Sequence, residues 1–314
     1  MEEKVLYSME SPFQQEINVK GYYFGKNEGK EHSACIVGAL RGNEYQQLYI
    51  CSKLIDVLKK IEKHGDIVGE NGILVIPSVS NMSMDFGKRF WISDDTDLNR
   101  LFPGNPSGES GSRVAYAIME TTKGYRYGIH LPSFYLGGTF MPHIRLLDPE
   151  HGSTSLANLF GLPYVIEAKS RPFDRTTLHN NWQRNGTEAF SLYTGMTGKI
   201  DDELAAQAVS SILRFLTRMG IIRYYSHSGY IASVLKEGDL EPIMTEAAGI
   251  FIKKAECGQE VSRGDVLAQI MKADSGEIIS EVKAPTDGII FYAETRPVVY
   301  SNLLEFQIIK RIHL

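Results

Sequence analysis

The sequence has no excess of positive charge and no hydrophobic run long enough to cross a membrane. Its formal net charge is -5 at pH 7, which gives no general attraction to nucleic acid or to an anionic membrane. A membrane-spanning helix needs about 20 apolar residues in succession, and no segment approaches this length. Met1 to Lys4 do not form a basic segment followed by an apolar one, so we expect no secretory signal. We expect neither nucleic acid nor a membrane as a partner.

Cysteine is also scarce. The chain has three, Cys35, Cys51 and Cys257, which are isolated from one another and lie in apolar surroundings. This usage is typical of buried, reduced thiols in a cytoplasmic protein, although three cysteines leave room for one disulfide.

The patterning of the first 235 residues predicts an α/β domain. Apolar runs at 33–40 and 73–77 flank a helical pattern at 43–63, which predicts a β-α-β unit with parallel strands. Further strands are expected at 16–24, 125–131 and 162–168, and further helices at 112–122 and 202–219. We therefore predict a mixed, mostly parallel sheet flanked by helices for residues 1–235.

Beyond Tyr230 the helical pattern stops. Short β-rich runs alternate with glycine-containing turns, which predicts a small all-β unit over 236–314. Its turns resemble the barrel-sandwich architecture of lipoyl and biotinyl domains. The carrier-lysine signatures of those domains are not in place around Lys272, so we expect neither lipoyl nor biotin and interpret the unit as structural.

Charged and polar residues follow the strands at the edge where α/β sheets place ligands. Arg41 and Glu44 lie in the turn after the strand at 33–40, and His130 ends the strand at 125–131. On these residues alone, Arg41 and Glu44 would be a surface ion pair at a helix start, and such pairs contribute little. Between the two strands, the long polar loop 78–111 contains the run Asp97-Leu-Asn-Arg-Leu-Phe-Pro-Gly104.

The turn 41–44, the run 97–104 and Ile129-His130 together resemble the succinylglutamate desuccinylase/aspartoacylase family, zinc hydrolases with the zinc-carboxypeptidase fold. In that family a His-Gly-x-Glu turn and a later histidine bind the metal, and Asp-x-Asn-Arg binds the substrate carboxylate. The resemblance covers nearly the whole chain and implies an N-acyl amino acid deacylase, an amide hydrolase. It assigns Glu44 and His130 as metal ligands, and Asn99 and Arg100 as the groups that bind a small carboxylate-bearing ligand.

The sequence departs from the family at the chemical positions. Arg41 occupies the place of the first zinc-binding histidine, and a guanidinium has no lone pair to donate to a metal. The resemblance matches Gly128 with an aspartate and places Tyr193 where the general-base glutamate belongs, with Glu188 as the alternative acid. Because a catalytic zinc normally has three protein ligands and works with a base, we expect the usual zinc hydrolysis to be impaired.

Three hypotheses follow. The chain is a metal-dependent hydrolase with a rebuilt site, whose replacement ligand is His143, His151 or His179, of which His143 is the preferred candidate. Alternatively, it is a binding module in which Arg41 replaces the positive charge of zinc by pairing with Glu44. In the third, the pocket is vestigial and the protein acts through partner contacts, with a homo-oligomer as one form.

Overall fold

The computed structural model describes residues 1–11, 13–26, 33–135, 137–148, 154–226 and 228–311. The chain divides into two compact units. The first comprises Met1–Ser133, Pro142–Tyr193 and Thr197–Val234, and the second comprises Phe134–Met141, Thr194–Met196 and Leu235–Leu314. All the candidate site residues within the described ranges belong to the first unit.

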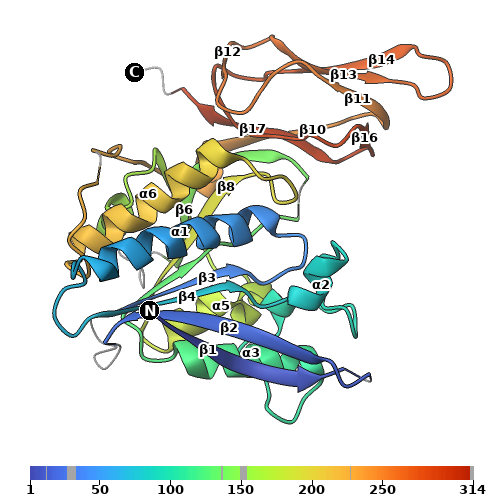
Figure 1. Ribbon diagram of the computed structural model, residues 1–314. Helices are drawn as coiled ribbons and strands as arrows, with labels where there is room; N and C mark the ends of the chain where they lie inside the picture. The colour runs from blue at the N-terminus through green and yellow to red at the C-terminus, as the bar shows by residue number, and fades with distance from the viewer. Residues whose placement is uncertain (12, 27–32, 136, 149–153, 227, 312–314) are drawn as a thin grey trace. The chain divides into compact units, whose positions relative to one another are not determined.

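A mixed sheet forms the centre of the first unit (Figure 1). The strands as far as Gly195 are β1 (Glu2–Glu10), β2 (Glu16–Gly25), β3 (Ala34–Ala39), β4 (Gly72–Ser78), β5 (Tyr127–His130), β6 (Thr139–Leu147), β7 (Tyr164–Ala168) and β8 (Glu188–Gly195). Their order is β1-β2-β4-β3-β5-β8-β6, and β7 pairs with β6. Pairs β3–β4, β3–β5, β5–β8 and β6–β7 are parallel, whereas β1 and β2 run antiparallel at the edge. This confirms the predicted mixed, mostly parallel sheet.

Helices cover both faces of this sheet. They are α1 (Tyr45–Lys63), α2 (Asn81–Asp85), α3 (Ser110–Thr122), α4 (Thr154–Asn158), α5 (Leu178–Arg184) and α6 (Asp202–Arg218), with the 3-10 turns η2 (Leu98–Arg100) and η3 (Pro172–Thr176). Apolar residues of α1 and α6 pack with Ile36 and Ile129 on one face. Residues of α3 and α5 pack with Val37 and Leu74 on the other. Alternate strand residues thus face opposite helix layers, as the period of two in a strand requires.

The long, periodic elements match the sequence prediction, and the irregular ones do not. Helix α6 begins after Asp201, whose side chain caps it by accepting a hydrogen bond from Leu204 N at 3.0 Å. Strands β1, β6 and β8 and the short helices α2, α4 and α5 were not predicted. His143, which follows Pro142 in a segment that the sequence suggests is a loop after His130, lies within β6, so that interpretation was wrong.

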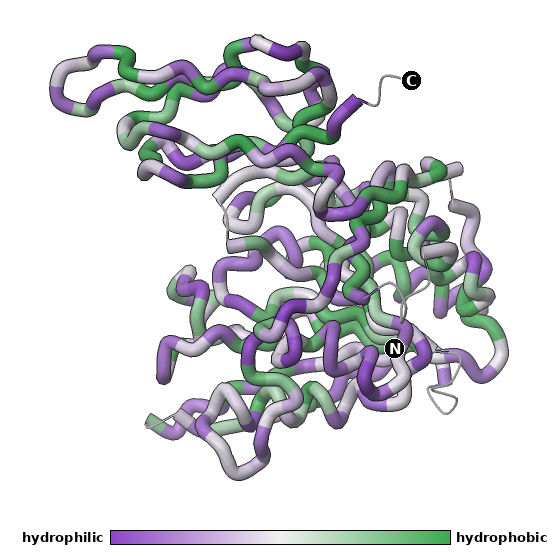
Figure 2. Tube along the Cα trace, turned by 180° about the vertical axis from the view of Figure 1, so that it is seen from behind, coloured by the Kyte–Doolittle hydropathy of each residue, from purple (hydrophilic) through white to green (hydrophobic). Residues whose placement is uncertain are grey.

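The second unit contains a separate four-stranded antiparallel sheet, in the order β14-β13-β11-β16. Strands from Ser233 onward are β9 (Ser233–Lys236), β10 (Leu240–Met244), β11 (Gly249–Lys253), β12 (Glu260–Val261), β13 (Val266–Met271), β14 (Ile278–Lys283), β15 (Gly288–Ala293), β16 (Val298–Val299) and β17 (Leu304–Lys310), with the 3-10 turn η4 (Glu237–Asp239). Hydrophobic and hydrophilic stretches alternate along these strands (Figure 2), as expected for sheets with one buried face. The exposed Lys272 lies in the β13–β14 hairpin, 3.5 Å from Asp274.

Two further sequence expectations concern helices and thiols. Among the residues that the structure describes, no helix combines the length and hydropathy needed to cross a membrane. All three cysteines are free; Cys35 and Cys51 are buried and Cys257 is partly buried.

Candidate functional site

The candidate site lies where three neighbouring parallel strands end. In the register of the sheet, Val37 of β3 lies beside His130 of β5, and His130 lies beside Ser191 of β8. Residues in register point to the same face, so the side chains of His130 and Ser191 both face the layer of α3 and α5. The turn with Arg41 and Glu44 follows β3 directly, which brings it to the same edge.

Arg41 is buried, with 2% of its surface exposed, and it is held by two carboxylates. Its Nε and Nη2 donate to the two oxygens of Asp97, each at 2.9 Å, in a bidentate fork. Its Nη1 donates to Glu44 Oε1 at 3.0 Å and to the carbonyl oxygen of Ser133 at 3.3 Å. The interpretation of Arg41 and Glu44 as a surface ion pair was therefore wrong, because neither residue is exposed.

Glu44 is fully buried, and hydrogen bonds engage both of its carboxylate oxygens. Oε2 accepts from the backbone N–H groups of Leu40 at 2.8 Å and Arg41 at 3.0 Å. Oε1 accepts from the Ser133 hydroxyl as well as from the guanidinium. Both oxygens of the acid that the family resemblance assigns to a metal therefore accept hydrogen bonds from the protein.

Together these contacts form a buried cluster of one cation and two anions. Burial lowers the pKa of Arg41, but the Glu44 and Asp97 carboxylates more than offset that effect and raise it above its usual range. Arg41 is therefore charged at every accessible pH. A buried charge cluster of this kind is stable only while each member keeps its partners.

Two buried histidines lie beside this cluster. His130 and His179 are 1% and 2% exposed, and His179 Nδ1 lies 2.8 Å from Ser191 Oγ. Within the described part of the chain, Nε2 of neither ring has a hydrogen-bond partner. Burial, with Arg41 adding repulsion, holds the pKa of His130 well below its usual range, and burial lowers the pKa of His179 to about 3. Both rings are neutral at pH 7.

A tryptophan fills the space where the family resemblance expects an aspartate. An added Cβ on Gly128 would lie 2.5 Å from the Trp182 ring, closer than real Cβ contacts allow. Trp182 is fully buried on α5 and donates from Nε1 to Thr122 Oγ1 at 2.9 Å. The glycine at this position is thus required by the packing of α5 against β5.

Tyr193 and His143 lie against each other. Their rings are stacked, with centroids 5.1 Å apart and planes 5° apart, and His143 is 1% exposed. Burial raises the pKa of Tyr193, so its hydroxyl stays protonated at neutral pH. A protonated phenol donates a hydrogen bond but is a poor proton acceptor, which argues against a general base at this position.

Asn99 and Arg100 form the turn η2 next to η3. Asn99 Oδ1 accepts from Leu178 N at 3.1 Å, and Arg100 Nη1 donates to the Phe173 carbonyl at 3.2 Å. The guanidinium of Arg100 also lies over the Phe173 ring, 5.1 Å from its centroid, while 27% of the side chain remains exposed. Arg100 is therefore held in place with part of its surface open to solvent.

The structure does not bring Glu188 to this site. Glu188 begins β8 and pairs with Tyr127, three residues before the His130 position. At about 3.3 Å per residue, this is about 10 Å from the edge where His130 lies. Glu188 instead lies 3.5 Å from Arg126. His151 lies outside the described residues.

Several residues of the site were not predicted in their roles. Within the matched run, Asp97 is interpreted from the sequence as orienting Arg100 or the loop. Its Oδ1 accepts from Asn99 N at 3.1 Å, and its carboxylate also holds Arg41. Ser133 and Ser191 were missed altogether. Ser133 follows β5 three residues after His130, and Ser191 lies in the middle of β8, in register with His130.

The donor set around Glu44 does not fit a zinc ion. A guanidinium 3.0 Å from Glu44 already provides the positive charge, and it provides no lone pair. Among the described residues, no group of three or more histidine, cysteine, aspartate or glutamate side chains is arranged to hold a metal.

Comparisons with known proteins agree with the fold. The family sequence model for the succinylglutamate desuccinylase/aspartoacylase catalytic domain matches residues 30–219 of this chain. The N-alpha-acetyl-L-2,4-diaminobutyric acid deacetylase of Halomonas elongata is 23% identical over 291 residues, covering 83% of this chain and 77% of the relative.

Solved structures share the architecture at lower identity. A succinylglutamate desuccinylase from Silicibacter sp. TM1040 matches with a TM-score of 0.81 and 18% identity, over 97% of this chain and 92% of that chain. The product-bound ectoine utilization protein EutE (DoeB) from Ruegeria pomeroyi matches with a TM-score of 0.79 and 18% identity, over 96% and 92%. At this identity the likeness concerns the fold.

Proposed function

Because the chain belongs to the succinylglutamate desuccinylase/aspartoacylase family, we propose that it binds a small carboxylate-bearing ligand of the N-acyl amino acid type without hydrolysing it through zinc. One observation carries the proposal: the Arg41 guanidinium is held by Glu44 and Asp97 at the position where the family resemblance expects a metal ligand. A fixed guanidinium there balances the charge of the carboxylates, but unlike a zinc ion it does not activate a water molecule. The free thiols support the cytoplasm as the compartment.

The ligand carboxylate is assigned to Arg100. Its partly exposed guanidinium is braced by the Phe173 carbonyl and ring, which reduces the entropy lost when it binds an oxyanion. The 23% identical Halomonas deacetylase is named for an N-acetylated amino acid, and this supports the choice of ligand class.

The metal content of protein purified without chelators tests the first half of the proposal. We expect well under one zinc per chain in the wild type by elemental analysis. We expect R41H, which rebuilds the His-Gly-x-Glu turn, to gain about one zinc per chain. R41Q is the matched control, because it removes the same cation without adding an imidazole. About one zinc per wild-type chain, lost in H130A, would overturn the proposal.

Thermal shift with a panel of N-acyl amino acids tests the second half. A ligand at about 100 times its Kd should stabilise the chain by about 2.7 kcal/mol. R100A should abolish this stabilisation, whereas R113A, which removes an exposed arginine on α3, should retain it. If no member of the panel raises the melting temperature, or R100A responds like the wild type, the carboxylate role of Arg100 is wrong.

The unpartnered histidine nitrogens support a second candidate, a metal-dependent hydrolase with a rebuilt site. Neutral His130 and His179 each have an Nε2 without a partner among the described residues, and buried nitrogens of this kind are potential metal ligands. This hypothesis predicts bound metal in the wild type that is lost in H179A and retained in H64A, since His64 is exposed in the turn that follows α1. Metal bound equally by both variants would reject it.

A further inference from the structure

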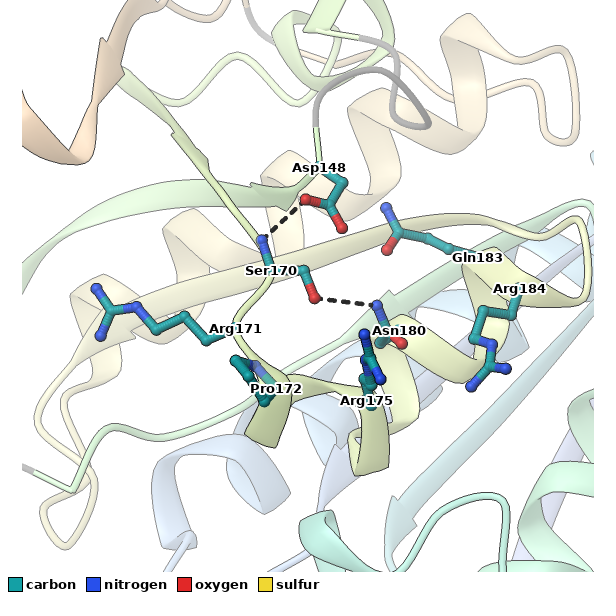
Figure 3. A pocket seen from close by; sticks show the side chains of 8 residues that line it. All are labelled: Asp148, Ser170, Arg171, Pro172, Arg175, Asn180, Gln183 and Arg184. Carbon is teal, nitrogen blue, oxygen red and sulfur yellow. Dashed lines mark hydrogen bonds between the residues drawn. The ribbon is translucent and has the colours of Figure 1, made fainter.

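A separate polar pocket lies on the outer side of η3 and α5. It has a volume of about 900 Å³, and three arginines line it together with two amide side chains: Arg171, Arg175, Arg184, Asn180 and Gln183 (Figure 3). Pro172 is the one apolar residue among those that Figure 3 labels as its lining. Such a lining suits a charged ligand, since most small-molecule pockets are predominantly apolar.

The pocket uses the face of α5 that points away from the sheet. Asn180, Gln183 and Arg184 are three and four residues apart, so they share one side of the helix. His179 and Trp182, on the other side, are buried toward β5 and β8. The pocket is therefore distinct from the cluster around Arg41.

Hydrogen bonds hold the walls of the pocket in place. Gln183 Nε2 donates to the Leu147 carbonyl at 2.7 Å, and Ser170 N donates to Asp148 Oδ1 at 2.9 Å. Asn180 Nδ2 lies 3.5 Å from Ser170 Oγ. In Figure 3, Arg171 and Arg184 extend at opposite sides of the pocket, with Arg175 and Asn180 between them. The positive groups are thus spread around a framed space.

The charge of this lining is unbalanced. Among the described residues that line the pocket there are three arginines and one carboxylate, that of Asp148, which accepts a hydrogen bond from Ser170 N. The Arg171 guanidinium lies over the Phe173 ring, 6.0 Å from its centroid. Within the described ranges, neither Arg175 nor Arg184 forms an ion pair. Like charges gathered around a pocket repel one another, and an anion between them would relieve this repulsion.

We propose that this pocket binds a small multivalent oxyanion, a molecule carrying two or more phosphate or carboxylate groups. Planar guanidinium forks match both kinds of group, and the spread of three arginines matches more than one charge. Asn180 and Gln183 add hydrogen-bonding groups for polar atoms between the charges. Nucleic acid is disfavoured, because the chain has a net charge of -5 and the arginines surround a discrete pocket.

Calorimetric titration at constant ionic strength tests the proposal, with inorganic pyrophosphate and citrate as probes and sodium chloride as the reference. We expect saturable binding of at least one probe, weakened at least tenfold in the double variant R175Q/R184Q. R113Q should bind like the wild type, since Arg113 is exposed and lies outside the pocket. The stronger probe assigns the oxyanion as phosphate or carboxylate.

Three results would overturn the proposal: no saturable binding of either probe, unchanged affinity in R175Q/R184Q, or tighter binding of a single-stranded oligonucleotide than of pyrophosphate. Circular dichroism of the double variant establishes that it is folded. R100A should keep its affinity for the probe, because Arg100 does not line this pocket. Loss of the proposed N-acyl amino acid binding therefore leaves this test unaffected.

Discussion

At the scale of the residue, Arg41 shows how burial changes the meaning of an ion pair. An exposed arginine and glutamate three residues apart contribute a few tenths of a kcal/mol. Here Arg41 is 2% exposed and Glu44 is fully buried, so water does not screen the attraction between them. Asp97 forms a second ion pair with the same guanidinium. The same residue that cannot bind a metal is required to compensate the buried carboxylate of Glu44 and the partly buried carboxylate of Asp97.

Removal of Arg41 should therefore strongly destabilise the first unit. R41A leaves Glu44 and Asp97 without their cation, and breaking a buried pair in this way costs about 3 to 5 kcal/mol. Urea denaturation followed by tryptophan fluorescence measures this directly, because Trp91 and Trp182 both lie in the first unit. R113A serves as the control, with an expected loss within about 0.5 kcal/mol. A loss below 1 kcal/mol for R41A would show that the cluster is not compensating buried charge.

At the scale of the element, the short segment η3–α5 connects the features of the site. Its η3 turn holds Arg100 through Phe173, and its buried face places His179 beside Ser191. Its outer face lines the polar pocket that contains the three arginines. Trp182 anchors this segment against β5 over Gly128. The position of α5 thus depends on the absence of a side chain on the neighbouring strand.

A methyl group at Gly128 should displace this segment. In G128A the new Cβ would lie 2.5 Å from Trp182, and such overpacking costs about 1 to 3 kcal/mol. The change should shift the tryptophan emission and lower the affinity for the ligand that Arg100 binds. G198A is the control, because an added Cβ there meets nothing within 4 Å and should leave stability unchanged or slightly raised. Equal stability of the two variants would disprove the tight packing of Trp182 on Gly128.

At the scale of the whole molecule, each unit contains its own buried titratable groups. In the first unit, burial lowers the pKa values of His130 and His179, so both rings are neutral at pH 7. In the second, Glu305 is fully buried, and burial together with the nearby Glu294 carboxylate raises the pKa of Glu305 to about 7. The unfolded chain should have an ordinary glutamate pKa of about 4.3.

The stability of the second unit should consequently fall as the pH rises from about 4.5 to 7. In that window the folded chain retains a proton on Glu305 that the unfolded chain releases, so the free energy of unfolding decreases with pH by a total of about 2 to 3 kcal/mol. E305Q should remove this decrease, and E246Q, at an exposed position in the same unit, should retain it. Urea denaturation followed by circular dichroism at several pH values provides the test. Parallel profiles for the wild type and E305Q would contradict it.

Sequence periodicity was sufficient for the regular elements of the fold. The stripe of α6 and its Asp201 cap, the strand–helix–strand order of β3, α1 and β4, and the separate β-rich C-terminal unit all follow from local patterns. Strand β6 was missed because Pro142 and charged residues interrupt its apolar pattern, and helix α5 because most of its residues are polar. Their conformation is stabilised by contacts with segments distant in the chain.

The sequence by itself determined the family, the fold class and the candidate residues, because motif spacing and hydrophobic periodicity are local properties of the chain. Only the tertiary structure decided how those residues pair. It joined Arg41 to Asp97, 56 positions away, separated Glu188 from the site, set Trp182 over Gly128 and gathered three arginines around one pocket. Burial and the distances between charged atoms depend on which segments the fold brings together, and these determine whether a charged pair lies in solvent or forms part of a site.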